Sequence, residues 1–456
     1  MRHRLTIVTC ALALAVQACA ASKPISRGAP VTAQAKAFPF PTTEKTLPNG
    51  LRVFVVEYDS PGLVAYYSIV RTGSRNEVEP GKSGFAHFFE HMMFRGTALF
   101  PTEKYNATLK AMGADSNAFT SDDMTVYHIL AGAEALPTIV TIEADRFQHL
   151  DYAEAEFQKE ARAVLGEYNK GASDPLQPMV EALYDHAFQT HTYKHTTIGF
   201  LRDIEDMPNQ FAYSRQFFDR YYRPDNTLLL IVGDVTADKV LPLIEEHYGA
   251  WATGPARSAI PTESPQTREQ RTTVPWEGAS LPMLLIGFHA PAFSTTNIDS
   301  AALEILGELV FAERSPLFRR LVLDEQKVEH IDGSVERHVD PNLFTILARV
   351  KQSKDVPYVE KAIYDEIARV AAQGTDTKTL AEVVSRTRYA FAGHLSTADR
   401  VALVGSEFLA LTGKLSTIDD AFTLLSQVTV ADVKRVAAKY FTAQNRTVVV
   451  LEPGEQ

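Results

Sequence analysis

His87-Phe88-Phe89-Glu90-His91 places two imidazoles and a carboxylate within five residues, with apolar side chains on both sides. On a helix of about 100° per residue, the histidines and Glu90 fall on one face and the phenylalanines on the other. The pattern therefore predicts a helix that packs one face into a core and presents two nitrogen ligands beside an acid on the other. Ser83 is the predicted N-cap and Gly96 the predicted stop.

The spacing H-x-x-E-H is typical of inverted zincins, in which both histidines bind zinc and the glutamate acts as general base. The alternative is an amphipathic helix with two surface histidines and a surface glutamate, because so short a pattern also recurs by chance.

A second helix is predicted from Phe157 to Tyr168, where apolar residues recur at helical spacing. Glu160 and Glu167 lie seven residues apart and so project from one side of it. A zinc hydrolase needs a third protein ligand and an open position for water. Taken alone, however, two such carboxylates are usually solvated surface groups.

With these motifs the chain resembles the pitrilysin/insulinase-type metallopeptidases, the group that includes the mitochondrial processing peptidase. In that family a liganding glutamate follows H-x-x-E-H on a later helix, and Glu167 matches it. Three further segments carry the resemblance, which extends over essentially the whole chain after residue 45: Pro48-Asn49-Gly50-Leu51-Arg52-Val53, Gly113-Ala114-Asp115-Ser116-Asn117-Ala118-Phe119-Thr120 and Arg223-Pro224-Asp225-Asn226.

The resemblance implies one zinc ion per chain, held by His87, His91 and Glu167, with Glu90 as the base. Two neutral ligands and one anion leave zinc with net positive charge, which lowers the pKa of its bound water to about 7. Glu160 matches a glutamate that orients a ligand or the base, and the alternative is a structural carboxylate paired with Arg162 or a lysine.

The resemblance also implies an α+β fold in which two homologous α/β sandwich halves form a clamshell wall around a chamber. Asn117 and Ala118 are then assigned to substrate binding at a strand edge. The alternative is that Asn117 caps a turn and Ala118 fills the core. The predicted divisions are 1–20 as signal peptide, 21–44 as tether, 45–250 as catalytic domain, 251–275 as linker and 276–456 as a noncatalytic domain of the same fold.

The predicted elements recur in the same order in both halves, but the second half lacks H-x-x-E-H. Its corresponding helix is predicted at 298–311. Strands are predicted at 45–58, 63–71, 124–130, 227–232, 283–288, 344–350 and 446–451, and long helices at 133–151 and 356–373.

Composition restricts the class of protein. With 456 residues, the chain is long enough for two or three domains, and its net charge of −11 argues against nucleic-acid binding. Cys10 and Cys19 are the only cysteines, so the body cannot use disulfides or thiolate ligands.

The first twenty residues have the pattern of a signal peptide. Arg2 and Arg4 precede an apolar run from Leu5 to Val16, which is too short to span a membrane stably, and small residues follow it. The sequence thus predicts an exported, periplasmic protein. Cleavage after Ala20 would release it, whereas cleavage before Cys19 would leave a lipid-modifiable cysteine as an anchor.

The predicted function is that of an exported zinc endopeptidase that acts on peptides or unfolded protein segments. One feature favours an alternative, a noncatalytic or partner-dependent peptide-binding subunit. Active relatives carry an Arg followed seven residues later by a Tyr in the second half. Here Arg319 and Arg320 are present, but no Tyr occurs between Tyr248 and Tyr358. The expected partner is a second chain of the same fold that supplies this pair, with a homodimer as the alternative.

Overall fold

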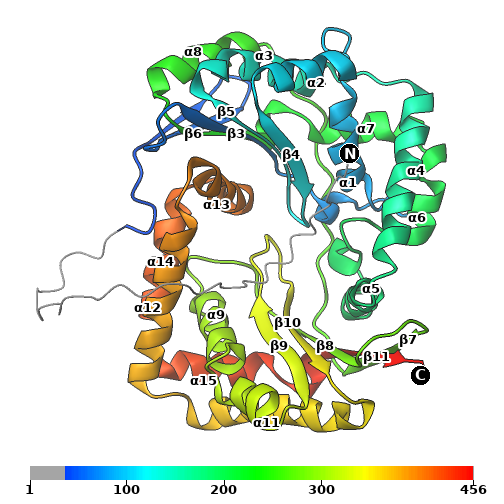
Figure 1. The fold of residues 1–456 in the computed structure, drawn as a ribbon, viewed down its shortest axis with the longest axis vertical. Helices are drawn as coiled ribbons and strands as arrows, with labels where there is room; N and C mark the ends of the chain where they lie inside the picture. The colour runs from blue at the N-terminus through cyan, green and yellow to red at the C-terminus, as the bar shows by residue number, and fades with distance from the viewer. Residues whose placement is uncertain (1–35, 455–456) are drawn as a thin grey trace, which may run out of the picture. The chain divides into compact units, whose positions relative to one another are not determined.

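The computed structural model describes residues 36–454, which are coloured in Figure 1. The predicted signal peptide, with Cys19, and most of the predicted tether lie outside the described residues.

The N-terminal half is built on a six-stranded sheet in the order β1-β2-β6-β3-β5-β4 (Figure 1). Strands β2 and β6 are parallel, and all other neighbours are antiparallel. Strand β4 is therefore an edge strand. The strands are β1 (Thr42–Thr46), β2 (Arg52–Glu57), β3 (Leu63–Val70), β4 (Asp115–Thr120), β5 (Thr125–Gly132) and β6 (Thr227–Gly233).

The C-terminal half repeats this topology in a five-stranded sheet of order β7-β11-β8-β10-β9. Its first pair, β7 and β11, is parallel like β2 and β6, and β9 is the edge strand that corresponds to β4. The prediction of two similar α+β halves is confirmed. The strands are β7 (Gln270–Trp276), β8 (Met283–His289), β9 (Val328–Val335), β10 (Leu343–Val350) and β11 (Arg446–Pro453).

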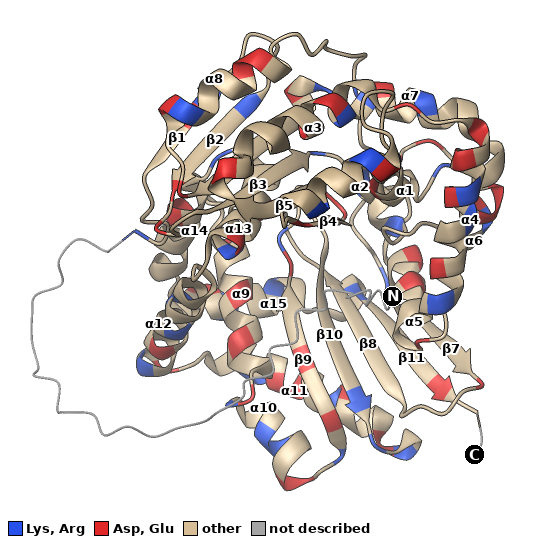
Figure 2. Cartoon of the chain, turned by 45° about the horizontal axis from the view of Figure 1, so that its top comes forward, with Lys and Arg blue, Asp and Glu red and all other residues tan. Residues whose placement is uncertain are grey.

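In Figure 2 the charged residues fall mainly on the helices and loops, and fewer lie on the strands. In the N-terminal half the helices are α1 (Phe85–Met92), α2 (Thr102–Ala111), α3 (Leu136–His149), α4 (Glu154–Gly171), α5 (Leu176–Ala187), α6 (Leu201–Asp206), α7 (Phe211–Tyr221) and α8 (Ala237–Tyr248). In the C-terminal half they are α9 (Ile298–Phe311), α10 (Pro316–Phe318), α11 (Val356–Gln373), α12 (Thr377–His394), α13 (Ala398–Thr412), α14 (Ser416–Gln427) and α15 (Val430–Tyr440).

Each half covers one face of the other half's sheet. Helix α13 packs against β3 and β6, and helix α5 packs against β7, β8 and β11 (Figure 1). A Cβ at Gly405 in α13 would lie 2.9 Å from Leu230 of β6, and one at Gly287 in β8 would lie 3.1 Å from Leu183 of α5. Such close packing places buried apolar residues of both halves in two shared hydrophobic clusters.

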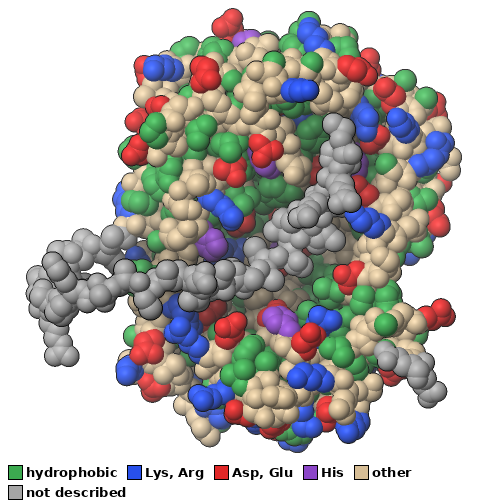
Figure 3. Space-filling view, viewed as in Figure 1, with side chains coloured by type: hydrophobic (Ala, Val, Ile, Leu, Met, Phe, Trp, Pro, Cys, Tyr) green, Lys and Arg blue, Asp and Glu red, His purple; other side chains and the backbone are tan. Residues whose placement is uncertain are grey.

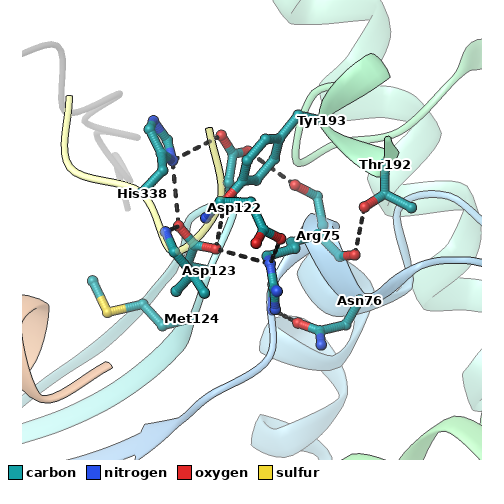
Figure 4. A network of polar contacts seen from close by, with 12 residues as sticks. Arg75, Asn76, Asp122, Asp123, Met124, Thr192, Tyr193 and His338 are labelled. Atoms are coloured by element: carbon teal, nitrogen blue, oxygen red, sulfur yellow. Dashed lines mark hydrogen bonds and ion pairs between the residues drawn. The ribbon is translucent and has the colours of Figure 1, made fainter. Parts of the chain in front are cut away.

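The halves also meet through buried polar groups just after β4 (Figure 4). Asp123 accepts hydrogen bonds from the Tyr193 hydroxyl at 2.8 Å and from the backbone N–H of Val339 at 3.1 Å. His338 Nδ1 lies 3.3 Å from the same carboxylate. Burial lowers the pKa of His338, but its contact with Asp123 and the nearby Asp122 raise it more, so the net shift is upward. A loop of the C-terminal half is thereby tied to the end of an N-terminal edge strand.

Three predicted boundaries differ from the structure. The segment 45–58 is two strands, because Pro48-Asn49-Gly50 turns the chain and Gly50 takes a positive φ of 92°. The predicted tether 21–44 ends inside β1, which pairs with β2 from Thr42 onward. The predicted linker 251–275 also ends early, because its last residues pair with β11 as strand β7.

Among the described residues, no single helix is long and apolar enough to cross a membrane. By length and composition alone, the bent pair formed by α13 and α14 passes that test when taken together.

Candidate metal centre

Helix α1 carries the H-x-x-E-H motif with the predicted division of faces. Its apolar side chains are buried, and those of His87, Glu90 and His91 are only partly so. The predicted N-cap is wrong, because Gly84 occupies that position. The Ser83 hydroxyl instead donates to Asp203 Oδ2 at 2.6 Å.

The first turn of α1 is held by a distant carboxylate. Glu77 is buried, and its two oxygens accept the backbone N–H groups of Gly84 at 2.7 Å and Ala86 at 2.6 Å. These are donors that a helix leaves unsatisfied at its start. Burial raises the pKa of Glu77 well above its ordinary value. Glu77 thus fixes the end of the helix that presents the motif.

Helix α4 lies beside α1 and supplies the two glutamates. Glu167 Oε2 lies 3.6 Å from His87 Nε2 and 3.4 Å from His91 Nε2. Ligand atoms of these three residues all fall within 4.8 Å of one another, and no other His, Cys, Asp or Glu group in the described chain does so. The structure therefore brings the three predicted ligands together.

The donor set fits zinc. Two imidazole nitrogens and one carboxylate oxygen are the three-ligand set of catalytic zinc sites, which keep a fourth position open. Both histidines face Glu167 through Nε2, and His87 Nδ1 is buried with no hydrogen-bond partner among the described residues. Nε2 is therefore the ring atom that is available for a metal on each histidine.

The two histidines differ in charge state in the metal-free chain. Burial lowers the pKa of His87 to about 4, so this ring is neutral near pH 7. Burial also acts to lower the pKa of His91, but the nearby carboxylates of Glu160 and Glu167 raise it to about 9. The pKa of Glu167 is lowered: burial opposes the shift, but the hydrogen bond and charge of His91 outweigh it.

Glu160 lies behind the centre and does not join the ligand group. It is buried, one oxygen lies 3.6 Å from His91 Nδ1, and the other forms an ion pair with Arg95. The predicted alternative named Arg162 or a lysine as its partner, whereas the structure has Arg95. Arg95 was not singled out in the sequence, although it lies four residues after His91, in the short 3-10 helix that continues α1.

Glu90 points toward β4. Its Oε2 accepts a hydrogen bond of 2.7 Å from the Thr120 hydroxyl. Burial raises the pKa of Glu90, although the Thr120 contact opposes this shift. The sequence does not predict this contact of Thr120, because no local spacing relates Thr120 to the helix that carries the motif.

Asn117 and Ala118 lie on β4, at the open edge of the sheet. The Asn117 side chain is exposed, and its Oδ1 accepts the Ala118 backbone N–H at 2.9 Å. The Ala118 side chain is buried against the core. The Ala118 methyl group therefore fills the core, as the alternative had it, but Asn117 lies within strand β4 and caps no turn.

The comparisons with known proteins cover both halves. A family model described as Insulinase (Peptidase family M16) matches residues 53–199, and one described as Peptidase M16 inactive domain matches residues 212–386. All the candidate site residues lie within the first match.

Similar proteins and structures agree with these matches. Zinc protease PqqE of Helicobacter pylori is 27% identical over 416 residues, which are 90% of this chain and 92% of that protein. The crystal structure of a protease from Helicobacter pylori is similar with a TM-score of 0.84 at 27% identity, covering 91% of this chain and 100% of that one. Mitochondrial-processing peptidase subunit beta of Bos taurus is 31% identical over 211 residues, 46% of this chain and 42% of that protein.

Proposed function

The chain belongs to the insulinase family, peptidase family M16, and on this premise we propose that it is a zinc-dependent endopeptidase that hydrolyses peptides or unfolded protein segments. The observation that carries the proposal is the grouping of His87, His91 and Glu167, with Glu90 one residue before His91 on the same helix.

His87, His91 and Glu167 would hold one zinc ion. When bound, zinc polarises the scissile carbonyl and makes water a stronger nucleophile near neutral pH. Glu90 accepts the proton of the attacking water and then donates it to the departing amine. Glu160, which is itself paired with Arg95, lies against Nδ1 of His91 and fixes the orientation of that ring.

The substrate would bind as an additional strand along β4. An extended peptide gains main-chain hydrogen bonds at an open strand edge. The Ala118 N–H is now bonded to the Asn117 side chain, so a peptide carbonyl would replace that amide oxygen. Figure 3 shows a hollow in the face between the two sheets, with hydrophobic side chains along its wall. Such a surface suits an unfolded segment better than a folded protein.

Zinc content and hydrolysis test this function together. Purified protein should hold about one zinc per chain by elemental analysis and should cleave a mixture of unstructured peptides, with loss of activity on chelation and recovery on adding zinc. Protein that holds zinc but cleaves no peptide, alone or with a partner, would contradict the peptidase proposal.

The second candidate is a peptide-binding subunit that retains a metal site. It is favoured by the absence of a Tyr between Tyr248 and Tyr358, where active relatives carry their Arg/Tyr pair. This candidate predicts peptide binding by fluorescence anisotropy without cleavage, whichever partner is added.

We also propose a partner of the same fold that lacks H-x-x-E-H but carries the Arg and Tyr. Loss of a donor to the developing negative charge commonly costs about 10²–10³ in rate. Light scattering and activity, measured on the chain alone and mixed with such a partner, should show a heterodimer with higher activity. Full activity of an isolated monomer would contradict the partner proposal, and a homodimer is its alternative.

Export to the periplasm is a further part of the proposal, supported by the first twenty residues of the sequence. Mass spectrometry of the native N-terminus should find either a start at Ala21 or a lipid on Cys19. Cytosolic protein that still carries residues 1–20 would contradict export.

A further inference from the structure

The general base is joined directly to the edge strand. Thr120 is the last residue of β4, and its hydroxyl donates to Glu90 Oε2 at 2.7 Å. A donor on a carboxylate forms one of the stronger hydrogen bonds found in proteins. This bond links the helix that carries the base to the strand along which the substrate would lie.

We propose that Thr120 is a positioning residue that fixes the rotamer of Glu90 and couples it to strand β4. The proposal rests on the proposed function and deepens it, because it assigns a role to a residue outside the motif and outside the ligand group. By occupying Oε2, the hydroxyl leaves Glu90 Oε1 to receive the proton of the attacking water.

The backbone around Thr120 is itself held firmly. Thr120 pairs with Thr125 on β5, and the next residue, Ser121, donates its N–H to the Met124 carbonyl at 2.8 Å. The Asp122 carbonyl accepts the Arg75 N–H at 2.9 Å, and the Asp122 side chain accepts the Ser74 hydroxyl at 2.9 Å.

Asp123, three residues after Thr120, accepts a hydrogen bond from the Tyr193 hydroxyl (Figure 4) and another from the backbone N–H of Val339 in the C-terminal half. A side chain can orient another only if its own backbone is fixed. The end of β4 meets this condition through contacts on both halves.

Geometry is the main contribution expected from this contact. A free glutamate side chain samples several rotamers, and a base must lie within hydrogen-bond reach of the proton that it removes. Without the hydroxyl, Glu90 keeps its place on α1 but loses the hydrogen bond that selects the productive rotamer. The loss should therefore appear in turnover and not in substrate or zinc binding.

Thr120→Val and Thr120→Ser separate this role from a structural one, because valine keeps the shape and serine keeps the hydroxyl. We expect T120V to lower kcat by about 10- to 100-fold with little change in KM. Zinc affinity, measured by competition with a chromogenic chelator, should be unchanged. T120S should recover most of the lost kcat.

Thr125→Val is the matched control. Thr125 faces Thr120 across the ladder and is buried, but its hydroxyl donates to the Thr72 carbonyl and not to Glu90. This variant should lose stability but keep kcat within about twofold of wild type.

The outcomes separate this proposal from the peptidase proposal. If wild type cleaves peptides and T120V turns over as fast, or if T120S is no better than T120V, the role assigned to Thr120 is wrong and the proposed function stands. If wild type with zinc bound cleaves nothing, either alone or with a partner chain, the peptidase proposal is wrong, and the role of Thr120 that rests on it is wrong too. Equal loss of kcat in T125V and T120V would show a general effect of strand packing and would also overturn the assignment.

Discussion

At the scale of single residues, the proposed zinc centre would depend on three side chains with no redundancy. Replacing His87, His91 or Glu167 by Ala should remove most bound zinc, because each would supply one of only three proposed protein ligands. Elemental analysis of the purified variants checks this, with unchanged circular dichroism as evidence of folding. Wild-type zinc content in any of the three would remove that residue from the ligand set.

Glu160 should show a smaller effect, because it contacts His91 and Arg95 but not the ligand group itself. We expect Glu160→Gln to weaken zinc affinity or turnover by about 10- to 100-fold, as is usual for groups that orient a ligand. Glu156→Gln, on the exposed side of the same helix, is the control and should match wild type. If the zinc affinity and turnover of Glu160→Gln equal those of Glu156→Gln, Glu160 only forms a structural ion pair with Arg95.

At the scale of an element, the position of α1 depends on Gly84. Its φ is 91°, and a Cβ there would lie 2.5 Å from the Ile198 carbonyl oxygen. Gly84→Ala should therefore destabilise the protein by more than the cost of a left-handed residue, which is about 1–2 kcal/mol.

Gly81→Ala is the matched control, because its φ of 76° is similar and a Cβ there meets nothing within 4 Å. Thermal unfolding should give a clearly lower Tm for G84A than for G81A. Equal Tm values would mean that the close approach to Ile198 does not fix α1.

The elements also differ in how far the sequence predicts them. Helices α9 and α11 begin and end as predicted, because their periodicity and end signals are local, such as the Asn297 side chain that accepts the Asp299 N–H. The N-cap of α1 was predicted wrongly, because the side chain of Glu77, and not that of Ser83, accepts the backbone N–H groups at the start of this helix. Strand β9 was not predicted, because an edge strand with Glu329, His330 and Asp332 exposed lacks an apolar pattern.

Within the site, too, local sequence signals could be read, whereas contacts between distant elements could not. The candidate ligand set that the structure groups together was predicted from sequence, since H-x-x-E-H is local and the resemblance supplied Glu167. Arg95 and Thr120 could not, because their contacts with Glu160 and Glu90 exist only once α1, α4 and β4 are assembled.

At the scale of the whole molecule, charged contacts between the halves should make stability depend on pH. Asp340 of the C-terminal half accepts Arg75 Nε at 2.5 Å and lies 3.0 Å from His191 Nε2. The hydrogen bond with His191, together with Arg75, lowers the pKa of Asp340 to about 2. A carboxyl group with a lowered folded-state pKa stabilises above its unfolded value of about 3.9, and this contribution is lost as pH falls toward 2.

Asp340→Asn should accordingly lower Tm near pH 7, and the difference from wild type should shrink once pH falls below about 4. Thermal unfolding over this pH range measures it, with the exposed Asp365→Asn as control. A difference in Tm that stays constant with pH would mean that the ionised carboxylate of Asp340 does not stabilise the contact between the halves.

The most direct test of the central claim is to compare zinc content and peptide hydrolysis in wild type and Glu90→Gln. Glutamine has the size of glutamate, and its amide oxygen can still accept the Thr120 hydroxyl, but it cannot act as a base. The three candidate ligands are unchanged. We predict equal zinc content and a fall in kcat of at least about 10²-fold, as expected for loss of a general base. Hydrolysis by the variant at the wild-type rate, with zinc bound, would contradict the account.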